Sequence, residues 1–166
     1  MYDWEVVRSD CGQMVWAAIA RILRNQVDVE DCYQEVFLEA FRRANARPVE
    51  NMPGFLRWLA VRRALDTVRK RDGTGLIANV DPSSLIDSAS DDRARCSDLL
   101  ESLRYELSQL PETQAEAFWL CCIEDRSYAE TGETLGIAAS HVGTLVYRTR
   151  QHLRKKLDAT NNRIIH

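Results

Sequence analysis

The sequence lacks the features that would place the chain in a membrane or mark it for export. No run of apolar residues approaches the roughly 18 that a membrane-spanning helix needs. The N-terminus, MYDWEVVRSD, has neither the basic start nor the apolar core of a signal peptide. We therefore expect a cytoplasmic protein without membrane insertion.

The sequence also lacks the cysteine pairs that a disulfide framework or a zinc site would need. Five cysteines, an odd number, argue against a disulfide framework. A zinc site usually needs two close pairs, and the only close pair is Cys121 and Cys122, whose side chains diverge on a helix. We interpret the cysteines as small buried hydrophobic residues and predict neither a metal nor a cofactor.

The residue patterns that enzymes use are missing as well. The sequence shows no nucleophile next to a base and no glycine-rich phosphate loop. We therefore predict no catalytic residues and a function other than catalysis. No segment alternates polar and apolar residues with period two, so no sheet is expected.

Charge is distributed unevenly, although the net charge is only −3. Residues 53–71 hold six bases and one acid, and residues 138–157 hold five bases and no acid. Residues 28–39 reverse this, with five acids and no base. The basic stretches suit phosphate backbones, and the acidic stretch suits a basic protein surface.

Apolar residues recur at helical spacing in most of the chain. The N-terminal helices are expected over about 9–25, over 29–46 with Asp28 as N-cap, and from Pro53 to just before Gly73. Residues 73–98 are rich in Gly, Ser and Asp and are predicted to be a flexible acidic linker. The C-terminal helices are expected over 99–110, 112–124, 128–135 and 138–157.

This pattern predicts an all-α fold of two small helical bundles joined by the linker. The first bundle is assigned to residues 1–72 and the second to residues 99–158, with a tail over 159–166. Bundles of this size have thin cores and should be marginally stable alone.

The stretch from Ser127 to Leu157 is typical of a helix-turn-helix. Ser127 can cap the first helix in a capping box with Glu130, and Gly136 can end it. Gly132 falls where the two helices would cross. The second helix would enter a DNA major groove at its N-terminal end. The residues predicted to contact this DNA are Ser140, His141, Thr144, Arg148 and Arg150. The alternative is an ordinary helical hairpin with a solvated basic end.

The helix from Pro53 combines aromatic residues with arginines, which suits single-stranded DNA because bases stack and phosphates pair. The alternative is a core tryptophan among solvated charges.

Three segments together resemble a known family. The run DVEDCYQEVFLEAFRRA (28–44) resembles the D-x-E-D-x-x-Q-E-x-F-x-x-A-[FW]-R signature of bacterial sigma factors of the extracytoplasmic-function group. FLRWLAVRRALDTVRKR (55–71) is similar to that family's W-L-x-x-I-A-x-N-x-x-x-D-x-x-R helix. Residues 107–157 are similar to its L-P-x-x-x-R…S-Y-x-E-I-A…L-G-I region. The matches occur in the family's order.

The resemblance implies partners and roles. The acidic helix would dock on the clamp of core RNA polymerase through Asp31, Gln34, Glu35 and Phe37, with Phe37 in part a core residue. The Pro53 helix and the preceding loop, 47–52, would open the minus-10 promoter element. Its matching residues are Arg57, Trp58, Arg62, Arg63, Asp66 and Arg69. The helix-turn-helix would read the minus-35 duplex. Members of the group are often held by an anti-sigma factor, and a long linker permits such a complex.

Some positions depart from the family's pattern. Arg62 replaces an asparagine, Thr131 and Gly132 replace Ile-Ala, and Gly143 and Leu145 replace basic residues. Two alternatives therefore stay open beside a promoter-specificity subunit. One is a helix-turn-helix regulator that works without polymerase, and the other is a degenerate family member that acts only through protein interaction.

Overall fold

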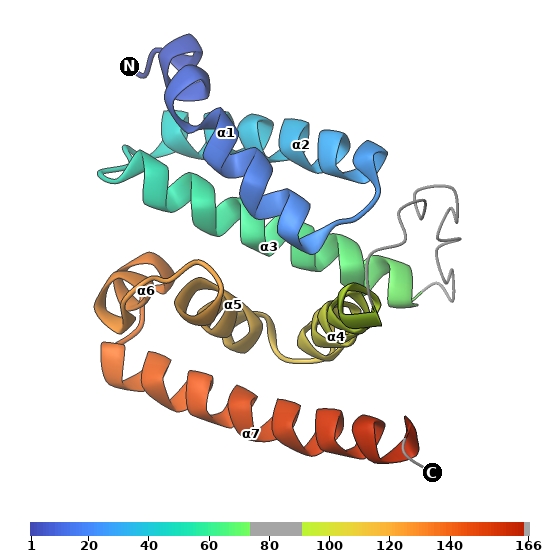
Figure 1. Ribbon diagram of the computed structural model, residues 1–166. Coiled ribbons are helices and arrows are strands. Elements are labelled where there is room, and N and C mark those ends of the chain that lie inside the picture. Colours follow the sequence, from blue (N-terminus) through green and yellow to red (C-terminus); the bar gives the residue numbers. More distant parts are fainter. Residues whose placement is uncertain (74–90, 165–166) are drawn as a thin grey trace.

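All regular structure in the computed structural model is helical over the residues that it describes, 1–73 and 91–164 (Figure 1). This confirms the predicted all-α fold. Within those ranges, no helix is both long and apolar enough to cross a lipid bilayer. The helices are α1 (Trp4–Ile22), α2 (Gln26–Ala46), α3 (Met52–Gly73), α4 (Asp91–Ser108), α5 (Glu112–Cys122), α6 (Tyr128–Leu135) and α7 (Ala139–Ile164).

Helices α1, α2 and α3 form the first bundle around buried apolar side chains. Val15 and Ile19 of α1, Val36 of α2, and Leu56 and Leu65 of α3 are completely buried. Burial of such side chains contributes about 1.5–3 kcal/mol each relative to exposure. Phe41 of α2 lies outside this core and is 47% exposed.

The three helices of this bundle begin at polar caps. Asp3 accepts hydrogen bonds from the first turn of α1, and the Asn51 side chain accepts one from Gly54 at the start of α3. The predicted cap of α2 is wrong: Asn25 accepts from the Val27 amide, and the helix begins three residues earlier than expected. Asp28 lies within the first turn instead and forms an ion pair with Arg71.

The second bundle starts earlier than the sequence suggested. Helix α4 begins at Asp91, so residues 91–98 are helical and not part of an irregular linker. This stretch contains neither glycine nor proline, the residues that most often end a helix, whereas the sequence before it contains Gly73, Gly75 and Pro82. The rest of the predicted linker, 74–90, lies outside the described residues.

Helices α4 to α7 pack around Trp119, where Leu107, Val142 and Val146 are completely buried. These residues belong to the same hydrophobic cluster as the buried residues of the first bundle. Within this bundle α6 has both ends predicted from the sequence. The Ser127 hydroxyl accepts from the Glu130 amide, and the Glu130 carboxylate accepts from the Ser127 amide, completing the capping box. Gly136 ends the helix at φ 69°, a conformation that suits glycine.

The two bundles pack directly on each other, with α3 in the middle of the molecule (Figure 1). One side of α3 contacts α1 and α2, and the other contacts α4 and α5. Helix α7 lies on the far side of the second bundle. This arrangement decides which of the predicted functional residues are exposed.

Candidate nucleic-acid interface

Helices α6 and α7 form the predicted helix-turn-helix, held close by Gly132. A Cβ atom at this position would lie 2.6 Å from the Ile137 carbonyl oxygen, so any larger residue would push the turn away. The Ile137 amide also donates to the Gly132 carbonyl at 2.9 Å. The prediction that a small residue permits the close approach is confirmed, and the closest contact is with the turn that leads into α7.

One face of α7 is open to solvent at its N-terminal end. Ser140, Thr144 and Arg148 follow each other at one-turn spacing on this face, His141 is exposed beside them, and the hydroxyl of Thr144 donates to the Ser140 carbonyl at 3.1 Å. On the opposite face, Val142 and Leu145 are buried. The helix therefore presents a polar and basic surface of the kind that enters a major groove.

Arg150 lies apart from this row. Its guanidinium reaches back to α5, where Nη2 lies 3.6 Å from the Cys122 sulfur. Arg150 lies two positions after Arg148 in the helix, and this spacing turns its side chain away from the Ser140 face. The structure thus brings four of the five predicted duplex-contacting residues together.

Two tyrosines beside this row were absent from the sequence prediction. Tyr147 is 63% exposed, one turn from Thr144, and helical spacing could have identified it. Tyr128 comes from α6, and a Cβ at Gly143 would lie 3.3 Å from its ring. Only tertiary structure brings that ring to α7.

The basic face of α3 is covered by the second bundle. Arg57 forms an ion pair with Glu124 at 3.0 Å, and Arg62 forms one with Glu112 at 3.3 Å. The Arg69 side chain donates to the Ser108 carbonyl at 3.3 Å.

The remaining α3 residues are paired within the first bundle. Arg63 forms an ion pair with Glu39 of α2, and Asp66 lies 2.7 Å from Arg69. All of the predicted minus-10 residues listed by number lie on α3. The charged side chains among them already pair with other groups of the protein.

Trp58 is the centre of this contact. Its Nε1 donates to Glu116 Oε2 at 3.0 Å, and the guanidinium carbons of Arg43 and Arg62 each lie 5.5 Å from its ring centroid. Cation–π attraction favours this arrangement. Trp58 is half-buried and packs against the hydrophobic core, so it is in part a core residue as well as a partner of these charged groups.

Two buried glutamates of the second bundle were missed by the sequence reasoning. Glu116 and Glu124 are 2% and 7% exposed. Burial raises the pKa of Glu116, although the hydrogen bond from Trp58 and the charge of Arg62 oppose the shift. Nothing in the local sequence distinguishes these carboxylates from solvated ones, because their partners are more than 50 residues away.

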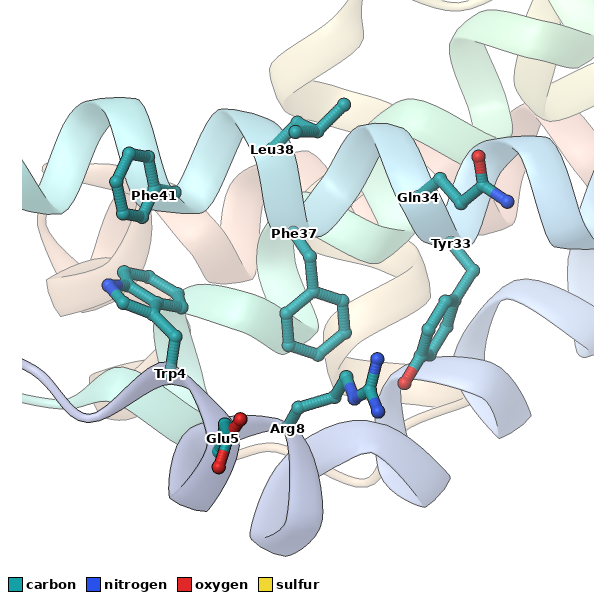
Figure 2. Close-up of a pocket in the computed structure, with 8 residues that line it drawn as sticks. All are labelled: Trp4, Glu5, Arg8, Tyr33, Gln34, Phe37, Leu38 and Phe41. Atoms are coloured by element: carbon teal, nitrogen blue, oxygen red, sulfur yellow. The ribbon is translucent and has the colours of Figure 1, made fainter.

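The predicted polymerase-docking face lies on α2, away from the second bundle. Asp31, Gln34 and Glu35 are exposed. Phe37 is partly buried against the core, which agrees with the prediction that it is in part a core residue. Gln34 also lines a groove between α1 and α2 that has a volume of about 510 Å³. Figure 2 shows the side chains that line it.

This groove has an aromatic lining supplied by α1 and α2. Trp4 and Phe41 pack edge to face with centroids 5.5 Å apart, and Tyr33 and Phe37 lie 4.9 Å apart. Phe41 and Leu38 are exposed at the edge of the groove. An apolar surface therefore adjoins the acidic face of α2.

The loop that precedes α3 is held in place by the N-terminus. The Tyr2 hydroxyl donates to the Val49 carbonyl and accepts from the Val49 amide, both at 2.7 Å. Met52, the end of the predicted loop, is the first residue of α3 and is buried. The loop therefore has a fixed position beside the N-terminal end of α3.

Cys11, Cys32, Cys121 and Cys122 are unpaired. No cluster of three metal-ligating residues occurs in the part of the chain that the structure describes. Burial, followed by the nearby Glu35 carboxylate, raises the pKa of Cys32 to about 12. Its thiol stays protonated at neutral pH, which makes it a poor nucleophile.

Comparison with known proteins agrees with this geometry. Residues 9–74 match the family described as Sigma-70 region 2, and residues 100–153 match Sigma-70, region 4. The chain is 31% identical over 160 residues to the ECF RNA polymerase sigma factor SigE of Mycolicibacterium smegmatis, covering 95% of this chain and 62% of that relative. It is also 31% identical over 154 residues to SigK of Mycobacterium bovis, covering 84% of this chain and 76% of SigK.

A solved structure shares the fold. The sigma factor RpoE of Bartonella quintana, determined in complex with the anti-sigma factor NepR, superposes with a TM-score of 0.56 at 18% identity. The superposition covers 95% of this chain and 98% of that one.

Proposed function

The chain belongs to the sigma-70 family, in the extracytoplasmic-function group of sigma factors, and on that basis we propose that it binds core RNA polymerase and directs initiation at specific promoters. The observation that supports this most directly is the presence of two distinct surfaces on one chain. An acidic face on α2 suits a protein partner, and an exposed polar row on α7 suits duplex DNA. Transcription of the chromosome would place the protein in the cytoplasm.

The first unit, residues 1–72, would bind core polymerase through α2. Asp31, Gln34 and Glu35 offer an exposed polar face, and Phe37 supports it from the core side. The aromatic groove beside them adds apolar area, and aromatic residues are enriched at the centres of protein interfaces. Charge complementarity would guide the approach of a basic partner surface.

The same unit would open the minus-10 element through α3. Unstacking a base costs on the order of a few kcal/mol, and stacking on Trp58 together with phosphate contacts would offset it. The phosphate contacts are assigned to the four arginines Arg57, Arg62, Arg63 and Arg69, and Asp66 would orient Arg69 as it does in the free chain.

The second unit, residues 99–158, would read the minus-35 duplex through α7. Ser140, His141 and Thr144 would meet base edges near the helix start, while Arg148 and Arg150 would lie along phosphates. Arg150 must leave Cys122 to do so, a movement that its exposed side chain allows.

We also propose an inhibitory protein as a partner of this chain. The RpoE structure is that of a sigma factor with an anti-sigma factor, and we extend this class of inhibitor to the present chain. Pull-down from the native cell tests it: recovery of an inhibitory protein beside polymerase supports the extension, and recovery of polymerase alone contradicts it.

Run-off transcription with purified core polymerase on a library of candidate promoters tests the main proposal. The proposal expects the chain to co-purify with core enzyme and to support initiation from a subset of the library. Duplex binding without core binding would favour a regulator that works alone. Core binding without promoter opening would favour a protein-interaction role.

A further inference from the structure

One side chain near the N-terminus ties the loop 47–52 to the rest of the first bundle. We infer that Tyr2 is a positioning residue for promoter recognition: it holds this loop in the shape in which its exposed side chains select an unpaired base of the minus-10 element. The inference rests on the proposed opening of that element, in which the family resemblance gives the loop a part. It adds the residue on which base selection depends.

Tyr2 binds both backbone polar groups of a single loop residue. Its hydroxyl donates to the Val49 carbonyl oxygen and accepts from the Val49 amide, each at 2.7 Å. A hydroxyl has one hydrogen to donate and lone pairs with which to accept, so one oxygen satisfies both groups. Phenylalanine has the same ring and offers neither bond. The contact joins residues 47 positions apart, so it fixes the loop to a distant segment and not to its own flanking helices.

The segment that carries Tyr2 is anchored independently of the loop. The Asp3 carboxylate accepts hydrogen bonds from amides in the first turn of α1 and caps that helix. The Trp4 ring packs edge to face on Phe41 of α2, with centroids 5.5 Å apart (Figure 2), and on Tyr2, with centroids 6.1 Å apart. The Tyr2 hydroxyl is therefore presented to the loop from a fixed base, as a positioning side chain requires.

The two ends of the loop are held by the adjoining helices, whereas its middle is held by Tyr2. The Arg47 amide donates at 2.9 Å to a carbonyl of the last turn of α2. The Asn51 side chain accepts at 3.0 Å from an amide of the first turn of α3. Between these anchors, Pro48 has no amide hydrogen to bond. The shape of the middle of the loop therefore depends on the two bonds between Tyr2 and Val49.

The loop lies at one end of the first bundle, between α2 and α3 (Figure 1). Arg47, Pro48, Glu50 and Asn51 are exposed, whereas Val49 is partly buried against the core. Because the backbone of Val49 is already bonded within the protein, base recognition falls to the exposed side chains. Groups held in one arrangement before binding lose less conformational freedom when a base binds, and a loop that does not shift cannot adapt to the wrong base.

The experiment compares Tyr2→Phe with wild type, each full chain assembled with purified core polymerase. The probe is a pool of single-stranded DNA oligonucleotides with a randomised central segment, and sequencing of the bound fraction gives the base preference at each position. Tyr105→Phe is the matched control, because it removes the same hydroxyl from an exposed tyrosine of α4. Tyr2→Phe keeps the ring that packs on Trp4, so folding is not at risk.

Two further measurements separate positioning from a general structural role. Anisotropy of a fluorescein-labelled chain gives its affinity for core polymerase. Amide hydrogen exchange in the free chain, followed by nuclear magnetic resonance, reports whether the Val49 amide is still bonded. Circular dichroism confirms that each variant is folded.

We expect Tyr2→Phe to lower the base preference at one or more selected positions at least about threefold, a factor set by the loss of two hydrogen bonds whose backbone partners can turn to water. The Val49 amide should exchange faster in Tyr2→Phe and at the wild-type rate in Tyr105→Phe. Affinity for core polymerase should be unchanged, because the acidic face of α2 keeps its exposed residues.

An unchanged base preference in Tyr2→Phe, an equal loss in Tyr105→Phe, or an unchanged exchange rate of the Val49 amide would overturn the inference. A matching fall in core affinity would show a general structural role and would overturn it as well. Wild-type chain that selects no sequence with core polymerase would refute the proposed function and the inference with it. That result is distinguishable, because it is seen before any residue is substituted.

Discussion

Two glycines of the helix-turn-helix should respond in opposite ways to the same substitution. Gly132 and Gly143 both lie within helices, where alanine is favoured over glycine by about 1 kcal/mol. The difference lies in what an added methyl group would meet. At Gly132 it would lie 2.6 Å from the Ile137 carbonyl oxygen, a backbone atom of the turn. At Gly143 it would lie 3.3 Å from the ring of Tyr128, an exposed side chain that can rotate aside.

The magnitudes follow from these contacts. Forcing an extra methyl group into a packed site costs typically about 1–3 kcal/mol, and at Gly132 the shift would also strain the bond from the Ile137 amide. We expect Gly132→Ala to lower the free energy of unfolding by about 1 kcal/mol after the helix gain is subtracted. Gly143→Ala should raise it by about 0.5–1 kcal/mol, because little opposes the helix gain.

Urea denaturation of the full chain, followed by circular dichroism, measures both changes. Each variant is the control for the other, since both convert a helical glycine of the same motif to alanine. Midpoints that rise for both variants would refute the reasoning, because helix propensity alone would then explain both changes. Midpoints that fall for both would refute it too, because the Tyr128 ring would then not have moved aside at Gly143.

Three further predictions concern other parts of the chain. Ser127→Ala should lower the free energy of unfolding by about 1 kcal/mol, because the capping box of α6 is lost, and urea denaturation checks it. Glu35→Lys should weaken binding to core polymerase at least about tenfold, measured by anisotropy, while Glu133→Lys should not. Glu116 has a raised pKa, so its protonation favours the folded state, and this contribution is lost as pH rises through that pKa. Glu116→Gln should therefore stabilise the chain at pH 7 and match wild type below about pH 4, where both side chains are neutral. An equal stability difference at both pH values would contradict that cause.

The sequence predicted local features well, because their causes are local. The capping box of Ser127 and Glu130 depends on a spacing of three residues, and the end of α6 depends on Gly136. Where it failed, a competing neighbour decided the outcome. Asn25 caps α2 instead of Asp28, which pairs with Arg71, a residue 43 positions away. Arg150 is a different case, because its place two positions after Arg148 already turns it off the Ser140 face, and there it contacts Cys122 of α5.

The residues proposed as functional show the same division. Helical periodicity places Ser140, Thr144 and Arg148 on one face of α7, and it places Asp31 and Glu35 on the exposed face of α2. Both sets could be identified from spacing alone, since a helix fixes the direction of each side chain relative to its neighbours. Their assigned contacts with DNA and polymerase remain predictions.

By itself the sequence determined the helices, the helix-turn-helix and the family, because periodicity, caps and ordered motifs are properties of short segments. Only the tertiary structure decided that Arg57, Trp58 and Arg62 are covered in the free chain. Glu116 and Glu124 reach them across more than 50 residues of sequence, and their burial depends on how two bundles pack. Charge spacing along the chain shows which residues can bind phosphate, but the packing of the bundles decides whether that surface is accessible.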